Sequence, residues 1–86
     1  MPRYLIERRF AERLEVDKTG AANIVRINDE EGVKWIFSFL SADKMRTYCL
    51  YEAPNMEAIR IAARRNSLPA DMIIEIDSEI RPEMFA

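Results

Sequence analysis

Residue types that can do chemistry are scarce in this sequence, and the single thiol, that of Cys49, is the first of them. Side chains along a strand alternate between two faces, and the expected alternation puts Cys49 on the same face as the carboxylates of Glu7 and Glu75. One thiolate and two carboxylates can bind a divalent metal, although imidazole is the usual nitrogen ligand of nickel, copper and zinc and the chain has no histidine. The candidate metal ligands are therefore Glu7, Cys49 and Glu75.

Large aromatic side chains share this predicted face and give it the character of a ligand pocket. Small-molecule sites are mostly apolar, with a few polar groups that orient the ligand. An equally simple interpretation is that the aromatic rings only fill the core of a dimer. The residues of the predicted pocket are Glu7, Trp35, Phe37, Phe39, Cys49, Tyr51 and Glu75.

Catalysis is an alternative use of the same face, with no residue assigned to it beyond a carboxylate. In an apolar chamber, Glu7 or Glu75 can act as a general acid or base. Cys49 has no histidine to activate it, so acyl transfer by a cysteine–histidine pair is excluded. A free cysteine in a strand is more often a small buried hydrophobic residue. Phosphate-binding and dinucleotide-binding loops are absent too, because the chain has only Gly20 and Gly32.

The spacing of apolar residues predicts four strands and two helices. Strands are expected at residues 4–9, within 33–54 as a hairpin, and at 72–80. One helix begins at a cap of Asp17 or Thr19 and stops before Gly32, and the other begins at Asn55. This βαββαβ order predicts a ferredoxin-like α+β fold, in which both helices cover one face of a four-stranded antiparallel sheet with the first and third strands at its centre. Residues 1–86 are expected to form this one domain.

Both faces of the predicted sheet are apolar, so each needs a cover. The helices are expected to cover the face that carries Tyr4, Ile6, Ile36, Leu40, Tyr48, Leu50, Ile74 and Ile76. The opposite face then carries the predicted pocket together with Leu5, Thr47 and Ile73. Because three large aromatic side chains on one strand are too much to leave in water, two copies are expected to pack sheet to sheet as a dimeric α+β barrel around the pocket.

Composition excludes several classes of protein. The 13 basic residues are scattered among 15 acidic ones, whereas a nucleic-acid-binding protein usually has a basic patch. No apolar run approaches the ~20 residues of a membrane helix, and the first residues lack the apolar core of a signal peptide. A single cysteine cannot form an intrachain disulfide and suits a reducing compartment. We therefore expect a cytoplasmic protein that has neither nucleic acid nor membrane as a partner.

Several segments taken together resemble a known family. They are Trp-Ile-Phe-Ser-Phe-Leu-Ser-Ala-Asp-Lys at 35–44, Thr-Tyr-Cys-Leu-Tyr-Glu-Ala-Pro-Asn-Met-Glu-Ala-Ile-Arg at 47–60, Ala-Ala-Arg-Arg-Asn-Ser-Leu-Pro-Ala-Asp at 62–71, and Met-Pro-Arg-Tyr-Leu-Ile-Glu-Arg at the start. The chain resembles the small bacterial nickel-binding-protein-like family, most of whose members have no known function. The resemblance implies a ferredoxin-like fold, commonly a homodimer with facing sheets, and bound nickel in at least some members.

The sequence departs from this family at positions that matter for nickel. Many relatives have a histidine where Phe37 stands and another near Ala62, and this chain has none. We expect a dimeric binding protein whose pocket between facing sheets takes a metal ion or a small apolar ligand, with nickel implied by the resemblance alone. The alternative is a small cofactor-independent enzyme of the isomerase or monooxygenase type, which is an analogy at the level of the fold.

Overall fold

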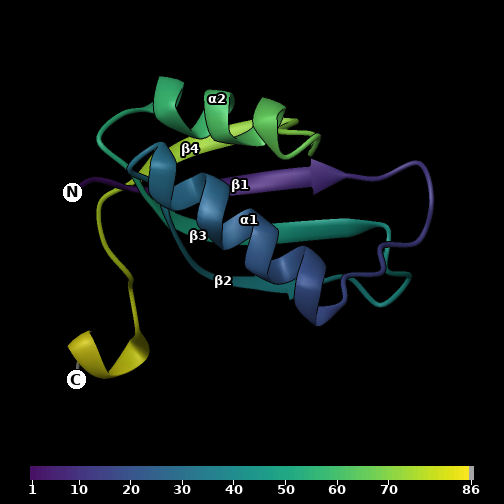
Figure 1. Ribbon diagram of the computed structural model, residues 1–86. Coiled ribbons are helices and arrows are strands. Elements are labelled where there is room, and N and C mark those ends of the chain that lie inside the picture. The colour runs from purple at the N-terminus through teal and green to yellow at the C-terminus, as the bar shows by residue number, and fades with distance from the viewer. Residues whose placement is uncertain (86) are drawn as a thin grey trace.

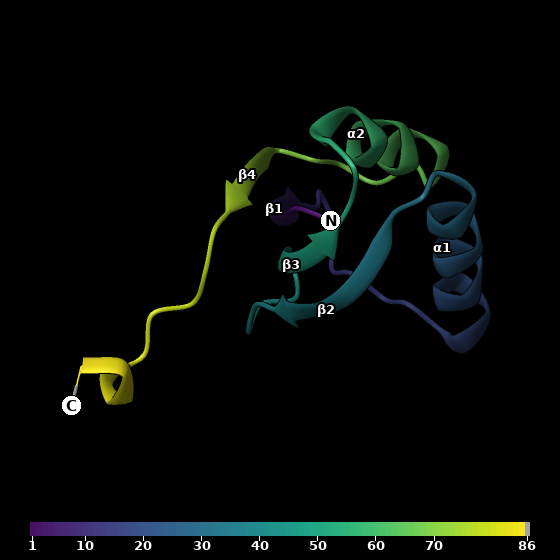
Figure 2. The same cartoon turned by 90° about the vertical axis from the view of Figure 1, so that its left-hand side faces the viewer.

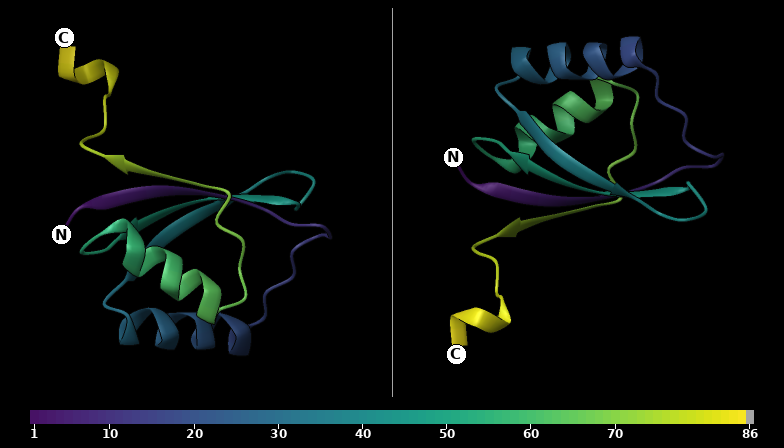
Figure 3. Two further views of the ribbon diagram at one scale, coloured as in Figure 1. Left: turned by 90° about the horizontal axis from the view of Figure 1, so that it is seen from above. Right: turned by 90° about the horizontal axis from the view of Figure 1, so that it is seen from below.

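A computed structural model describes residues 1–85, and its elements occur in the predicted order. The strands are β1 (Arg3–Arg9), β2 (Lys34–Leu40), β3 (Arg46–Glu52) and β4 (Met72–Ile76); the helices are α1 (Lys18–Glu30) and α2 (Met56–Arg65), followed by a short 3-10 helix at Pro82–Phe85. The strands pair antiparallel in the order β2-β3-β1-β4, and both helices lie on one face of the sheet (Figures 1 and 3). The ferredoxin-like α+β fold is confirmed, with β1 and β3 at the centre.

Side-chain caps at predicted positions begin both helices. Asp17 accepts a 2.7 Å hydrogen bond from the backbone N–H three residues later, and Asn55 accepts an equivalent bond of 2.9 Å. Just beyond the end of α1, Gly32 adopts a φ of 71°, in the left-handed region that favours glycine. Neither helix in the described part of the chain has the length and apolar character needed to cross a membrane.

The two helices pack against the sheet to different extents. α2 buries Ile59, Ala62 and Ala63, and the full burial of Ile59 contributes about 1.5–3 kcal/mol. α1 buries only Asn28, near its C-terminal end, while its two isoleucines remain half-buried. Because α1 is anchored mainly at one end, a pocket remains between the rest of the helix and the sheet.

A cluster of ion pairs joins the C-terminal ends of the two helices. Arg65 of α2 donates hydrogen bonds to Glu30 at 2.5 Å and to Glu31 at 2.7 Å. The hydrogen bond from Arg65 lowers the pKa of the Glu30 carboxyl group below its ordinary value. The acidic end of α1 therefore ties this helix to α2.

The register of the central strands corrects the predicted faces of β3. Tyr4 pairs with Tyr51, and Ile6 pairs with Cys49. Directly opposed residues of neighbouring strands share a face, so Thr47, Cys49 and Tyr51 face the helices, and all three are buried. The prediction that they lie on the face away from the helices is wrong.

The predicted faces of β4 are reversed in the same way. Ile73 pairs with Ile6 and packs against the core, whereas Ile74 is 43% exposed on the other face. Glu75 pairs with Tyr4 and is exposed on this edge strand. A shift of one residue moves every side chain of a strand to the opposite face, and both faces here are apolar. The residues wrongly expected to face the helices in these two strands are Tyr48, Leu50, Ile74 and Ile76.

A β-bulge separates the three aromatic residues of β2. Trp35 pairs with a helix-facing residue of β3 and Phe37 with an outward-facing one, which leaves Ile36 as an extra residue between the two pairs. Trp35 therefore faces the helices, whereas Phe37 and Phe39 face away from them as predicted. The aromatic residues do not share one face.

The sheet face opposite the helices, which we call the open face, is not covered by either helix (Figure 3). Phe37 is 46% exposed and Phe39 is 65% exposed, and their rings meet edge to face with centroids 5.3 Å apart. The C-terminal segment leaves β4 on this same side of the sheet, away from the helices (Figures 2 and 3). It carries three further exposed apolar side chains, those of Ile80, Met84 and Phe85.

Candidate ligand pocket

A partly open pocket of about 250 Å³ lies between α1 and the helix-facing side of the sheet. Its buried floor consists of Arg8, Thr47, Cys49 and Tyr51, each at most 5% exposed. Apolar side chains form most of the remaining lining, namely those of Phe10, Leu14, Ile24, Trp35 and Leu68. Val16 and Leu40 also line it and are 46% and 47% exposed, so the rim is apolar as well.

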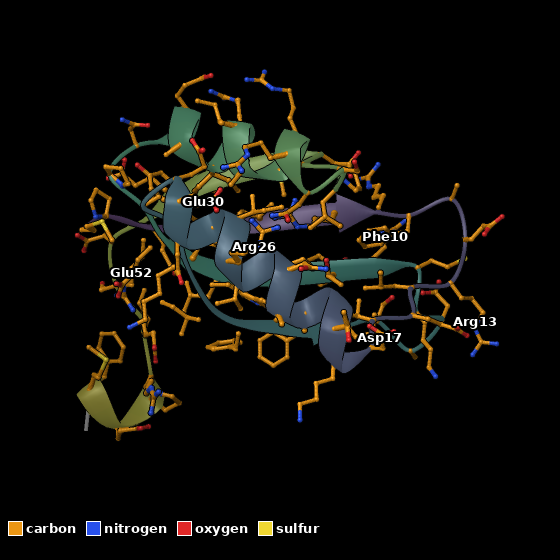
Figure 4. The ribbon with its side chains drawn as sticks, viewed as in Figure 1. Phe10, Arg13, Asp17, Arg26, Glu30 and Glu52 are labelled. Atoms are coloured by element: carbon orange, nitrogen blue, oxygen red, sulfur yellow. The ribbon has the colours of Figure 1, made fainter. Side chains whose placement is uncertain are left out.

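The loop at residues 10–16 contributes to the pocket because the turn between β2 and β3 holds it in place. The backbone N–H groups of Phe10 and Leu14 donate hydrogen bonds of 2.8 and 2.7 Å to carbonyl groups of that turn. Figure 4 shows Phe10 beside the end of β1 and Asp17 at the start of α1, with the loop running between them. A segment without regular structure thus supplies apolar side chains to one side of the pocket.

The guanidinium group of Arg8 is the unusual part of the floor. Arg8 is 3% exposed and follows Tyr4 and Ile6 on the helix-facing side of β1. One of its terminal nitrogens donates a 2.6 Å hydrogen bond to the carbonyl of Pro69, and the other lies 3.5 Å from the hydroxyl of Tyr51. Its guanidinium carbon is also 5.6 Å from the centroid of the Tyr51 ring. Among residues 1–85, no carboxylate oxygen lies within 4.0 Å of Arg8.

A chain of hydrogen bonds crosses the floor beside Arg8. The indole N–H of Trp35 donates to the hydroxyl of Ser38 at 2.9 Å, and this hydroxyl donates to the thiol of Cys49. The thiol in turn donates to the hydroxyl of Thr47 at 3.5 Å. Burial raises the pKa of Tyr51, while the nearby Arg8 acts in the opposite direction. Tyr51 is therefore neutral at pH 7, and its hydroxyl can both donate and accept a hydrogen bond.

The structure divides the predicted pocket between the two faces of the sheet. The pocket beneath α1 contains three of the predicted residues, Trp35, Cys49 and Tyr51. The open face carries Phe37, Phe39 and Glu7. The Glu7 carboxylate accepts a 2.6 Å hydrogen bond from Arg9. Glu75 is exposed on the edge strand β4 and does not line the pocket.

The three predicted metal ligands are not brought together within one chain. Cys49 faces the helices, Glu7 lies on the open face, and Glu75 lies at the sheet edge. In the part of the chain that the structure describes, no three Cys, Asp, Glu or His side chains are grouped closely enough to hold a metal ion. The residues of a single copy therefore do not fit a nickel site.

Most of the residues that line the pocket were not predicted from the sequence, among them Arg8, Ser38 and the loop at residues 10–16. Arg8 did leave a signal, because it follows Tyr4 and Ile6 at the two-residue period of the buried face of β1. An arginine at a core position is costly without a partner, so it marks a site to inspect. Ser38 left no such signal, because the bulge in β2 decides its face.

Comparisons with known proteins agree with the fold. The family described as nickel responsive protein SCO4226-like matches residues 4–76. The crystal structure of SCO4226 from Streptomyces coelicolor A3(2) is similar with a TM-score of 0.77 at 20% sequence identity, over 91% of this chain and 99% of that chain. No curated protein matches. The resemblance found in the sequence is confirmed, and the chain belongs to the SCO4226-like family of nickel-responsive proteins.

Proposed function

We propose that this protein binds a small, largely apolar molecule in the pocket beneath α1. The observation that carries the proposal is the pocket itself, about 250 Å³ of mostly apolar lining above a buried polar floor. Small-molecule sites commonly measure roughly 300–1,000 Å³, so this pocket is slightly smaller than usual and suits a small ligand. The polar floor orients such a ligand, and the apolar lining holds the rest of it.

The loose packing of α1 supports this proposal. The helix buries only Asn28, so its first turns are not held by a packed core. Val16 and Leu40 at the rim are each nearly half exposed. A ligand that covers this rim removes apolar surface from water, which is worth about 25 cal/mol per Å².

Nickel and catalysis find less support in this pocket. The family name associates its members with nickel, but the pocket contains one thiol and no carboxylate or imidazole among the described residues. The alternative of a small enzyme that uses a carboxylate lacks its acid or base there for the same reason. We therefore favour a binding protein.

The test uses neutral fragments and a variant that fills the pocket. Indole, benzyl alcohol and phenylacetamide are titrated against the protein by ligand-observed NMR. We expect the wild-type protein to bind at least one of them, and Ile24→Trp to abolish binding because its indole ring occupies the pocket. Val25→Trp is the matched control, since Val25 is the next residue of α1, is 45% exposed and does not line the pocket. Binding that survives Ile24→Trp, or no binding by wild-type protein, overturns the proposal.

We also propose that the protein is a homodimer formed through the open face. One row of apolar residues crosses all four strands there, because Phe37 pairs with Leu50, Leu50 with Leu5, and Leu5 with Ile74. The C-terminal segment presents further apolar side chains on the same side of the sheet. We favour a second copy as the cover, because each copy then shields the open face and the C-terminal segment of the other copy from water. The ligand pocket lies on the opposite side of the sheet, so it stays accessible in such a dimer.

The free thiol of Cys49 supports a reducing compartment such as the cytoplasm as the proposed location.

A further inference from the structure

We infer that the pocket beneath α1 selects an apolar carboxylate, whose carboxylate group is held by the guanidinium of Arg8. This inference rests on the proposed ligand-binding function and adds the chemical class of the ligand. It assigns to Arg8 the role of the anion-binding residue, with an aromatic or branched aliphatic tail in the apolar part of the pocket.

The first argument is the unbalanced charge of Arg8. A buried charge is costly unless a counterion or a full set of hydrogen bonds compensates it. The arginines of this chain that pair with carboxylates are all exposed, namely Arg9, Arg26, Arg60, Arg64, Arg65 and Arg81. Arg8 is 3% exposed and has no such partner in the described residues. An anionic ligand supplies the missing charge.

The second argument is the number of hydrogen-bond donors left over. A guanidinium group has five N–H donors in a planar fork. One donor is bound to the carbonyl of Pro69 at 2.6 Å. A second terminal nitrogen lies 3.5 Å from the hydroxyl of Tyr51, which is a long hydrogen bond. At most two of the five donors therefore have an acceptor among residues 1–85, and Arg8 lines the pocket. A carboxylate matches this fork with two parallel hydrogen bonds.

The surroundings of Arg8 set the orientation of the ligand. Thr47 is the direct cross-strand partner of Arg8 and lines the pocket on the same face, so its hydroxyl is available to donate to the second carboxylate oxygen. The ring of Tyr51 lies against the guanidinium and limits how the fork can turn. Apolar side chains surround the rest of the space up to Val16 and Leu40 at the rim. The polar end of the ligand therefore points to the floor and its tail points to the opening.

The competing explanation is that Arg8 serves only to fasten the turn after α2 through the carbonyl of Pro69. In that case the pocket has no preference for a negative charge. Phenylacetate and phenylacetamide separate the two explanations, because they share one shape and differ in charge. Acetate, which lacks the ring, measures the contribution of the carboxylate alone.

The experiment measures the affinity of wild-type protein for these three probes at constant ionic strength. We expect phenylacetate to bind about ten- to hundredfold more tightly than phenylacetamide, the range of a charge-assisted hydrogen bond to a buried group. Acetate should bind at least about tenfold more weakly than phenylacetate because it buries no ring. Arg8→Met should abolish the preference for phenylacetate and retain phenylacetamide binding.

Arg60→Met is the matched control, because it removes the same charge from an exposed position of α2 that does not line the pocket. It should keep the preference. Equal affinities for phenylacetate and phenylacetamide overturn the inference and leave the ligand-binding function standing. Equal affinities for acetate and phenylacetate overturn the apolar part of the inference. Absence of binding by all three overturns both proposals. If Arg8→Met does not fold, the wild-type comparison of the two matched probes decides alone.

Discussion

Replacing Phe39 with glutamate should convert the proposed homodimer into a monomer. Phe37 and Phe39 are 46% and 65% exposed on the open face. A phenylalanine offers roughly 150–250 Å² for burial, so these two residues expose about 200 Å² per chain and about 400 Å² per dimer. At ~25 cal/mol per Å², covering them contributes about 10 kcal/mol before other costs. Association itself costs roughly 4–15 kcal/mol, so the dimer depends on this contribution.

Phe39 supplies more than half of this aromatic surface, which is about 6 of the ~10 kcal/mol gained by covering the two phenylalanines. Losing it raises the dissociation constant by about ten-thousandfold, since each 1.4 kcal/mol is a factor of about ten. The two new carboxylates would also lose solvation in the interface, which weakens it further.

Sedimentation equilibrium of the wild-type protein and the variant at about 10–100 μM measures this rise in the dissociation constant. Val25→Glu is the matched control, because it places the same charge on the 45% exposed Val25 of α1, on the helix side of the sheet. The control should remain a dimer, and circular dichroism checks that both variants are folded. A folded Phe39→Glu variant that stays dimeric, or a wild-type monomer at the highest concentration, refutes the reasoning.

Two further predictions concern the pocket and nickel. Burial raises the pKa of Tyr51, so the unfolded protein ionises this group first and the unfolding free energy should fall as the pH rises above the unfolded value of about 10. In urea titrations, Tyr51→Phe should remove the part of this fall in unfolding free energy that Tyr51 causes, whereas Tyr48→Phe should keep it. An unchanged fall in Tyr51→Phe would show that Tyr51 is not its cause. Nickel titrated in a calorimeter should show no site tighter than about 10 μM, because the chain has no histidine. A stoichiometric submicromolar site would contradict this.

The element order, the helix caps and the faces of β1 could be predicted because they depend on neighbouring residues. Asp17 and Asn55 cap helices through backbone groups three residues away. The side chains of β1 alternate without a bulge, so that Tyr4 and Ile6 share one face and Leu5 and Glu7 share the other. The resemblance to the family rested on equally local strings of residues, and it led to the right fold.

The faces of β3 and β4 could not be predicted, because they depend on which residues of distant strands pair. Ile6 meets Cys49 on one side and Ile73 on the other, and in a sheet that is apolar on both faces a shift of one residue gives an equally plausible pattern. The bulge at Ile36 likewise arises from pairing across the hairpin and separates Trp35 from Phe37. The candidate site moved with these strands, from the open face to the side beneath α1.

The sequence by itself therefore determined the list of elements, their order and the fold, since capping and periodicity act over a few residues. Only the tertiary structure formed the pocket that we propose as the ligand site. It buried Arg8 without a carboxylate partner among residues 1–85, brought the loop at residues 10–16 over the sheet, and left α1 anchored at Asn28 with a space beneath it. Each of these results needs contacts between segments far apart in the chain, and the balance among such contacts cannot be read from local sequence patterns.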